Sequence, residues 1–138
     1  MIKAVYDTNI IVSGLLNSEG IPALLLDIAT QREITLFISP EILQEYEGVL
    51  IRPKFGLSKR VVKRFLRLIK ARSKPVKPKS LEFTLKDPED NKFLECALAG
   101  KVDCLVTGNT RHFPFRSHKG IKVIASREFW VVYMASLW

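Results

Sequence analysis

Cysteine, histidine and long apolar runs are all scarce in this sequence of 138 residues. Two cysteines, Cys96 and Cys104, cannot build a disulfide framework, and both stand in apolar stretches where a reduced thiol packs as a small hydrophobe. The longest apolar run, Phe129 to Trp138, is shorter than the roughly 18 residues that a membrane span needs. No small-residue cleavage site follows the apolar N-terminal stretch, as a secretory signal would require. We therefore expect a soluble, cytoplasmic protein with no membrane partner.

A glycine-rich phosphate loop is also missing. The nearest glycines, Gly14 and Gly20, come far past the turn that begins at Asp7, and no P-loop pattern occurs. A phosphatase of the haloacid-dehalogenase type would need a second aspartate two residues after Asp7, where this chain has Asn9. The sequence therefore gives no support for a nucleotide cofactor and little for that phosphatase class.

Acidic residues are absent between Gly48 and Leu81, where 12 lysines and arginines stand. The whole chain has 22 basic and 14 acidic residues, so the remainder holds 22 − 12 = 10 bases against 14 acids. A basic block beside an acidic remainder is typical of a protein that binds a polyanion, although solubility alone would also explain it.

Short apolar strands alternate with helices along the chain, which predicts a single α/β domain over residues 1–138 with a parallel sheet covered on both faces. The predicted strands are Ile2–Tyr6, Ile34–Ile38, Asp103–Thr107, Ile121–Ile124 and a short edge strand around Val76. The predicted helices are Ile10–Leu16, one from Pro22, one from Ser39 to before Pro53, one from Leu57 to Lys70, one from Asp87 to Gly100, and one capped by Ser126.

The helix predicted from Leu57 to Lys70 carries much of the basic block. Its expected apolar stripe consists of Leu57, Val61, Phe65, Leu68 and Ile69. Another face carries a basic stripe, which consists of Lys59, Lys63, Arg67 and Lys70. The stripe could follow a nucleic-acid backbone, and a merely solvated face is the alternative.

Oxygen-bearing side chains follow the predicted strands, at the sheet edge where sites of parallel α/β proteins lie. They are Asp7 and Asn9 after the first strand, Glu41, Glu45 and Glu47 on the helix after the second, Asp90 near the fifth helix, and Asn109 after the Cys104 to Val106 strand. Carboxylate and amide oxygens are hard ligands that suit Mg²⁺ or Mn²⁺ while leaving positions for water and phosphate. The pattern therefore indicates metal-assisted phosphoryl transfer to water.

Each acid also has a structural interpretation. Asp7 could be a turn residue whose side chain bonds the backbone. Spacing on the third helix does not choose between Glu45 and Glu47, which stand just outside opposite edges of its apolar arc. Asp90, three residues after Asp87, could close a capping box.

Five motifs together resemble the PIN-domain family, and in particular the toxin components of prokaryotic toxin–antitoxin pairs. In chain order they are Asp7-Thr8-Asn9, Ser39-Pro40-Glu41-Ile42-Leu43-Gln44-Glu45, Arg52-Pro53-Lys54-Phe55, Asp87-Pro88-Glu89-Asp90-Asn91-Lys92-Phe93 and Asp103-Cys104-Leu105-Val106-Thr107-Gly108-Asn109. The likeness runs from Ile2 to about Phe129. It implies a three-layer α/β/α sandwich with a central, mostly parallel sheet.

The resemblance also implies a Mg²⁺- or Mn²⁺-dependent ribonuclease, often a homodimer, that a cognate antitoxin protein inhibits. It places the catalytic and metal-binding acids at Asp7, Glu45 and Asp90, and so chooses Glu45 over Glu47. The fourth metal position falls on Asn109, where many members have aspartate. An amide oxygen can ligate a cation, but it lacks the charge and cannot act as a base.

The candidate RNA-binding residues are Asn9, Lys59, Lys63, Arg67 and Arg111. His112 is left out of the catalytic set, because a lone histidine in a loop is more often solvated. Because Asn109 replaces the fourth acid, an alternative function is a non-catalytic RNA-binding or regulatory PIN-like module. The uniformly apolar Phe129 to Trp138 run predicts that one helix face packs internally and another meets a second subunit or an antitoxin.

Overall fold

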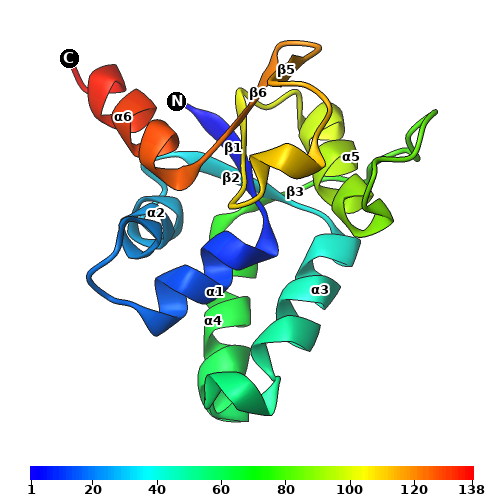
Figure 1. The fold of residues 1–138 in the computed structure, drawn as a ribbon. Coiled ribbons are helices and arrows are strands. Elements are labelled where there is room, and N and C mark those ends of the chain that lie inside the picture. The colour runs from blue at the N-terminus through cyan, green and yellow to red at the C-terminus, as the bar shows by residue number, and fades with distance from the viewer.

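A computed structural model describes residues 1–138 and contains one sheet of six strands in the order β3-β2-β1-β4-β6-β5 (Figure 1). The strands are β1 (Lys3–Tyr6), β2 (Thr35–Ile38), β3 (Lys74–Pro75), β4 (Cys104–Val106), β5 (Ser117–His118) and β6 (Ile121–Ile124). Every neighbouring pair is parallel except β5 and β6, which are antiparallel. The mostly parallel sheet expected from the alternating pattern is therefore present.

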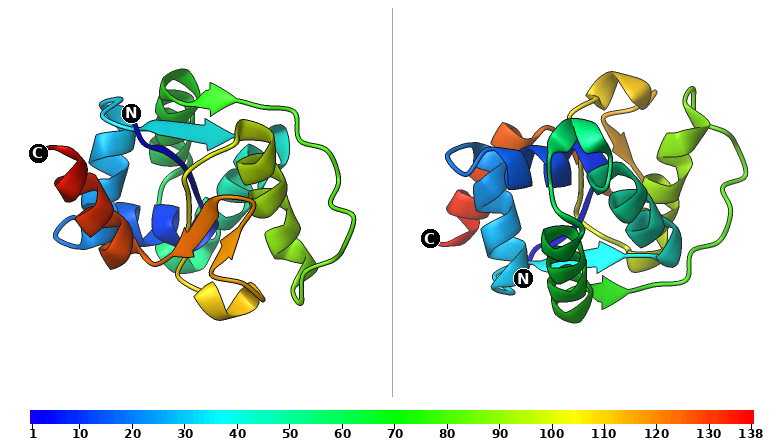
Figure 2. Two further views of the ribbon diagram at one scale, coloured as in Figure 1. Left: turned by 90° about the horizontal axis from the view of Figure 1, so that it is seen from above. Right: turned by 90° about the horizontal axis from the view of Figure 1, so that it is seen from below.

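Six α-helices surround the sheet, with α2 and α6 on one side and α5 on the other (Figures 1 and 2). The helices are α1 (Thr8–Leu16), α2 (Ile21–Thr30), α3 (Pro40–Leu50), α4 (Lys59–Arg72), α5 (Asn91–Gly100) and α6 (Ser126–Ser136). Short 3₁₀ turns occur at η1 (Pro53–Phe55), η2 (Pro88–Asp90) and η3 (Thr110–His112). This arrangement confirms the expected α/β/α sandwich.

Local capping chemistry starts α3 where the sequence predicts it, whereas α1, α2, α4 and α5 begin one to four residues from their predicted starts. The Ser39 hydroxyl accepts the amide hydrogen of Ile42 at 3.3 Å and begins α3, where Pro40 occupies the first helical position. At α6 the prediction was wrong by one residue, because Ala125 is the cap position and Ser126 is already helical. The Glu128 carboxylate accepts the Ala125 amide hydrogen at 3.4 Å and replaces the expected serine cap.

The inner face of α4 differs from the predicted stripe. Val62, Phe65 and Ile69 are buried, whereas Val61 and Leu68 are about half exposed. The buried positions follow the 3–4 residue spacing of one helix face, and the run of apolar residues at 61 and 62 left that face ambiguous by one position. The basic stripe of α4 is exposed, as expected.

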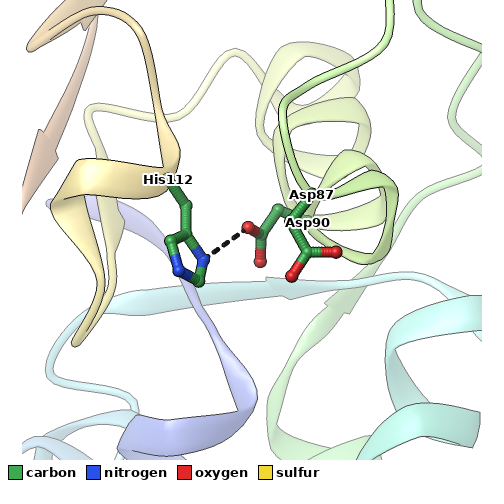
Figure 3. Close-up of side chains that lie close together, drawn as sticks. All are labelled: Asp87, Asp90 and His112. Atoms are coloured by element: carbon green, nitrogen blue, oxygen red, sulfur yellow. Dashed lines mark hydrogen bonds and ion pairs between the residues drawn. The ribbon is translucent and has the colours of Figure 1, made fainter.

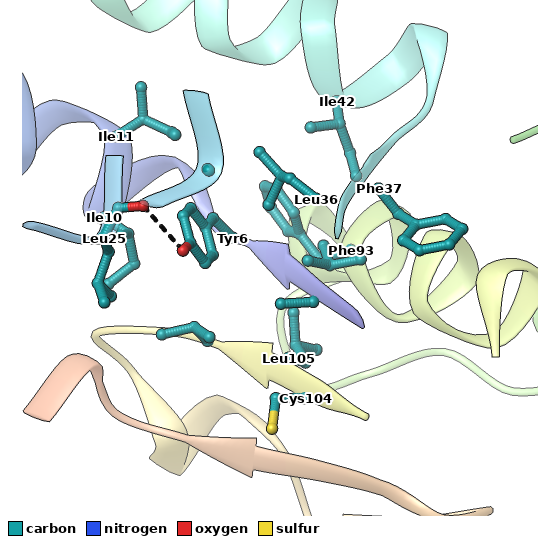
Figure 4. Close-up of a cluster of buried hydrophobic side chains, with 14 of the residues drawn as sticks. Tyr6, Ile10, Ile11, Leu25, Leu36, Phe37, Ile42, Phe93, Cys104 and Leu105 are labelled. Carbon is teal, nitrogen blue, oxygen red and sulfur yellow. Dashed lines mark hydrogen bonds between the residues drawn. The ribbon is translucent and has the colours of Figure 1, made fainter. Parts of the chain in front are cut away.

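Two buried tyrosines hold the helices onto β1. The Tyr6 hydroxyl donates to the Leu25 carbonyl oxygen of α2 at 2.9 Å (Figure 4), and the Tyr46 hydroxyl of α3 donates to the Tyr6 carbonyl oxygen at 2.5 Å. On the α5 side, Gly100 lies so close to Phe37 that a Cβ would stand 2.6 Å from the ring. These contacts set the rotation and depth of the helices that carry the candidate site.

Both cysteines are buried and free, and burial raises the pKa of Cys96 to about 12 and that of Cys104 to about 11. No single helix is long and apolar enough to cross a membrane. The α1–α2 pair reaches the length and composition of a span only together, with a bend of 104°, and residues such as Ile11 and Leu25 are buried in the core.

The strand register aligns the carboxyl ends of three strands. Tyr6 of β1 is paired with Val106 of β4, and Val106 with Ile124 of β6. Beyond the strands, the Asp7 amide donates to the Val106 carbonyl oxygen at 2.9 Å, and the Thr107 amide donates to the Ile124 carbonyl oxygen at 3.0 Å. The residues that follow β1, β4 and β6 therefore lie side by side along one edge.

The β5–β6 hairpin is absent from the predicted elements. Its turn residues Lys119 and Gly120 have positive φ angles of 50° and 83°, which suits a two-residue hairpin turn. Because β5 has only two residues, no alternating pattern marks it in the sequence.

Candidate active site

Asp7 stands directly after β1 and is buried. One carboxylate oxygen accepts the Asn9 amide hydrogen at 2.8 Å and caps α1, while the other accepts the Thr107 hydroxyl hydrogen. The interpretation as a turn residue whose side chain bonds the backbone is therefore confirmed, and it does not prevent the carboxylate from lying at the sheet edge. Burial raises the pKa of Asp7, against the lowering effect of these hydrogen bonds, and the charge of Asp90 raises it further.

Glu45 is placed by the turn of α3 that the neighbouring Tyr46 anchors to β1. Its side chain is 19% exposed, accepts the Thr8 hydroxyl hydrogen and forms an ion pair with Lys92 at 2.5 Å. Lys92 also pairs with Glu89 at 3.1 Å. Glu47 is exposed and contacts neither Thr8 nor Lys92. The structure therefore brings Glu45, and not Glu47, against the first turn of α1, which Asp7 caps.

Asp90 ends η2 and precedes α5, but its side chain makes no capping hydrogen bond. The capping-box interpretation is therefore wrong for Asp90. Instead, the Asp90 carboxylate accepts a hydrogen bond from His112 Nδ1 at 2.9 Å. Burial raises the pKa of Asp90, the His112 contact opposes this, and the charges of Asp87 and Glu45 raise it further.

The acidic cluster, which we define as Asp7, Glu45 and Asp90, therefore joins three segments that are remote in sequence. Asp90 raises the pKa of Asp7, and Glu45 raises that of Asp90, so each negative charge acts on the next across the site. Such mutual repulsion is the electrostatic pattern that a bound cation relieves.

His112 belongs to this site, contrary to the expectation of a solvated loop residue. One potential ligand atom each from Asp87, Asp90 and His112 lies within 4.8 Å of the other two, and the imidazole on η3 faces the two carboxylates in front of α5 (Figure 3). Asp7 and Glu45 are not part of this tighter group. The only sequence signal was the position of His112 three residues after Asn109, in the same loop.

The remaining candidate residues differ in whether they are linked to the acidic cluster or line a neighbouring groove or cavity. The backbone N–H of Asn109 donates to the Thr107 hydroxyl at 3.0 Å, which links the backbone of Asn109 through Thr107 to Asp7. Asn9 lines a groove beside Glu45, whereas Arg111 lines a separate cavity. The α4 candidates Lys59, Lys63 and Arg67 are exposed and line neither.

The groove beside Glu45 has a volume of about 800 Å³, and Val49 is the one hydrophobic residue in its lining. Its charged lining consists of three acids and two cations, namely Glu41, Glu45, Glu89, Arg52 and Lys92, and Thr8 and Asn9 also line it. A groove lined by both carboxylates and cations is suited to a phosphodiester held against a metal ion.

The residues present fit a divalent cation. Carboxylate oxygens and the Asn109 amide form a hard donor set that suits Mg²⁺ or Mn²⁺, and the His112 imidazole adds a donor that Mn²⁺ accepts. In the structure, Lys92 balances part of the negative charge through its contact with Glu45. Cation binding would require Glu45 to give up at least part of its contact with Lys92.

Comparison with known proteins agrees with this geometry. The uncharacterized protein MJ1680 of Methanocaldococcus jannaschii is 33% identical over 112 residues, which cover 78% of this chain and 71% of the relative. The family model of the PIN domain matches residues 3–111, a segment that contains the acidic cluster and Asn109. PIN domains are in general metal-dependent nucleases. The fold, the edge position of the acids and this match establish that the chain belongs to the PIN domain family.

Proposed function

We propose that this protein is a metal-dependent ribonuclease that hydrolyses RNA phosphodiester bonds. The observation that carries the proposal is the hydrogen bonding at the carboxyl edge of the sheet. There Thr8, next to Asp7, donates to Glu45. The loop after β4 bonds Asp7 through Thr107 and brings His112 against Asp90. Asp7 is buried and the other two acids are partly buried, and acids with pKa values raised by burial and by neighbouring charges are typical of functional sites. The regional excess of lysine and arginine is consistent with a polyanionic substrate.

In this proposal Asp7, Glu45, Asp90 and Asn109 hold a Mg²⁺ or Mn²⁺ ion. When bound, the ion supplies polarisation of the scissile phosphate and a lower pKa for the attacking water. Thr107 and the Asn9 amide orient the Asp7 carboxylate. Thr8 orients Glu45, and Lys92 is placed to bind a substrate phosphate oxygen once it leaves Glu45.

The test is incubation of the purified protein with mixed cellular RNAs in Mg²⁺, in Mn²⁺ and in chelator. Matched single-stranded DNA and double-stranded RNA provide the substrate controls. We expect cleavage of RNA that needs the divalent ion and that chelator abolishes. Cleavage that persists in chelator, or that affects only DNA, would contradict the proposal.

A second function is favoured by two observations. Lys92 already pairs with Glu45, and Asn109 lacks the fourth charge, so the cation site is weaker than one built from four acids. A non-catalytic RNA-binding module would bind RNA in the same buffers without shortening it. A binding titration and a gel of the same samples distinguish the two functions.

We also propose that the ribonuclease is the toxin of a toxin–antitoxin pair and acts in the cytoplasm under control of a cognate antitoxin protein. Support comes from the motif resemblance and from free, buried cysteines that need no oxidising compartment. Induced expression in a bacterial host should stop growth, and Asp7→Asn should not. Continued growth with a soluble, RNA-cleaving wild type would contradict the toxin role.

The basic stripe of α4 is proposed as an additional contact for the RNA backbone. Each phosphate contact on single-stranded RNA contributes about −0.7 to the slope of log affinity against log salt. Neutralising Lys59, Lys63 and Arg67 to glutamine should therefore flatten that slope by about two units. Fluorescence anisotropy at several salt concentrations measures it, and an unchanged slope would assign the stripe to solubility.

The outer face of α6 is proposed as a homodimer interface. Phe129 and Tyr133 are buried against the domain, whereas Val131 and Leu137 are about 60% exposed. Because Tyr133 also donates to Glu33 at 2.9 Å, truncation from Tyr133 would damage the monomer itself. Val131→Lys with Leu137→Lys is therefore the cleaner change.

We expect this double variant to shift the protein from dimer to monomer, because two charges on each copy would be buried at a symmetric contact. Light scattering gives the mass, and thermal melting checks the fold. A wild type that is monomeric at all concentrations would contradict the dimer and leave the face for the antitoxin.

A further inference from the structure

A second concave site lies beside the acidic cluster, at the carboxyl end of β6. This flanking cavity has a volume of about 600 Å³, within the range of roughly 300–1,000 Å³ typical of small-ligand sites. Phe113, Val123 and Ile124 supply its apolar lining. Its other walls come from η3, the segment before β5 and the first turn of α6.

The flanking cavity is positively charged and its cations are free. Arg111, Arg116 and Lys122 line it, are exposed and take part in no ion pair or side-chain hydrogen bond. Glu128 is the one acid in the lining, and its carboxylate is bound to the Ala125 amide at 3.4 Å. Unpaired cations around a hollow are suited to anionic groups such as phosphates.

An aromatic ring is held in the same wall. Phe115 is half-buried and stacks on His118, with ring centroids 4.5 Å apart and planes inclined by 24°. Phe113 lies against it at 6.3 Å. A ring fixed by two neighbours at the wall of a basic hollow offers the stacking platform that single-stranded nucleic acids use.

The flanking cavity and the acidic cluster share the short turn η3. Arg111 lines the cavity, and the next residue, His112, contacts Asp90. Along the sheet edge, Asp7 is bonded to Val106 and Thr107 to Ile124, which lines the cavity. A strand held at the cluster would therefore meet the cavity within a short distance along the edge.

We propose that the flanking cavity is a nucleotide subsite for single-stranded RNA next to the bond that is cleaved. Arg111, Arg116 and Lys122 bind backbone phosphates there, and Phe115 stacks on a base. The inference rests on the proposed function, and it adds where the substrate lies and which residues select single strands.

The test uses the double variant Arg116→Gln with Lys122→Gln, and neither residue belongs to the acidic cluster. The charge-matched control is Lys3→Gln with Lys101→Gln, at the amino-terminal edge of the sheet. All proteins carry Asp7→Asn to prevent cleavage, and the probe is a fluorescein-labelled ten-nucleotide single-stranded RNA in Mg²⁺. The cavity pair should weaken binding roughly tenfold and flatten the salt slope by about 1.4, since two contacts contribute about 0.7 each.

Phe115→Leu tests stacking with little loss of apolar volume, and melting checks that the variant folds. We expect several-fold weaker binding of the single strand and no change for a blunt RNA duplex, whose bases are not available to stack. Wild-type affinity in the cavity pair, or equal weakening by the control pair, would overturn the subsite. Absence of any RNA binding by the parent protein would instead remove the proposed function.

Discussion

Asp7→Asn is expected to lower RNA cleavage by on the order of 10²- to 10³-fold or more, the scale seen when one electrostatic group of an active site is removed. The substitution keeps the side-chain size and the oxygen that accepts the Asn9 amide hydrogen. It removes the charge that, with Glu45 and Asp90, would hold the cation. Single-turnover cleavage of a labelled RNA in Mn²⁺ measures the effect.

The same variant should be more stable than the wild type in chelator at neutral pH. Folding raises the pKa of Asp7, chiefly through burial, so the folded protein binds this proton more tightly than the unfolded chain. The ionised carboxylate therefore lowers stability as the pH rises from the unfolded pKa near 3.8 through the raised folded pKa. The advantage of the variant should vanish at pH below 3.8.

Asp27→Asn is the matched control, because Asp27 is exposed in the middle of α2 and undergoes the same chemical change. It should leave both cleavage and melting temperature close to wild type. A folded Asp7→Asn protein with full activity would refute the assignment of Asp7 to the active site. A variant that melts at a lower temperature than the wild type would refute the claim that the buried, ionised Asp7 carboxylate lowers stability.

Asn109→Asp is expected to tighten Mn²⁺ or Mg²⁺ binding by about tenfold, or ~1.4 kcal/mol, because it adds a negative charge beside the acidic cluster. The backbone of Asn109 lies next to that region, because the Thr107 hydroxyl accepts the Asn109 backbone N–H and donates to Asp7. Without metal, the added charge should lower the melting temperature by repelling Asp7 and Asp90. With metal bound, Asn109→Asp should instead have the higher melting temperature of the two proteins.

Titration calorimetry with each ion measures the affinity, and melting with and without metal checks the reversal. Asn17→Asp is the control, since Asn17 caps the far end of α1 and gains the same charge there. Equal or weaker affinity in Asn109→Asp would show that residue 109 is not near the cation. Equal tightening by Asn17→Asp would reduce the effect to net charge.

Much of the fold could be predicted because its signals are local. Ser39-Pro40 starts α3 through one side chain and one fixed φ angle, and apolar runs such as Ile34–Ile38 mark buried strands. Alternation of these elements leaves few arrangements other than a parallel sheet. The two-residue strand β5 and the buried face of α4 escaped this reasoning, because each depends on packing partners rather than on its own pattern.

The sequence by itself therefore determined the fold class and, through the family motifs, predicted the three acids. Only the tertiary structure decided what surrounds them: Lys92 on Glu45, His112 on Asp90 and Thr107 on Asp7. It also placed Glu45 against Thr8 and left Glu47 exposed, because the Tyr46 hydrogen bond to β1 sets how α3 is rotated. The physical reason is distance along the chain, because a local pattern sets a residue's helix or strand but not which remote side chain meets it across a sheet edge.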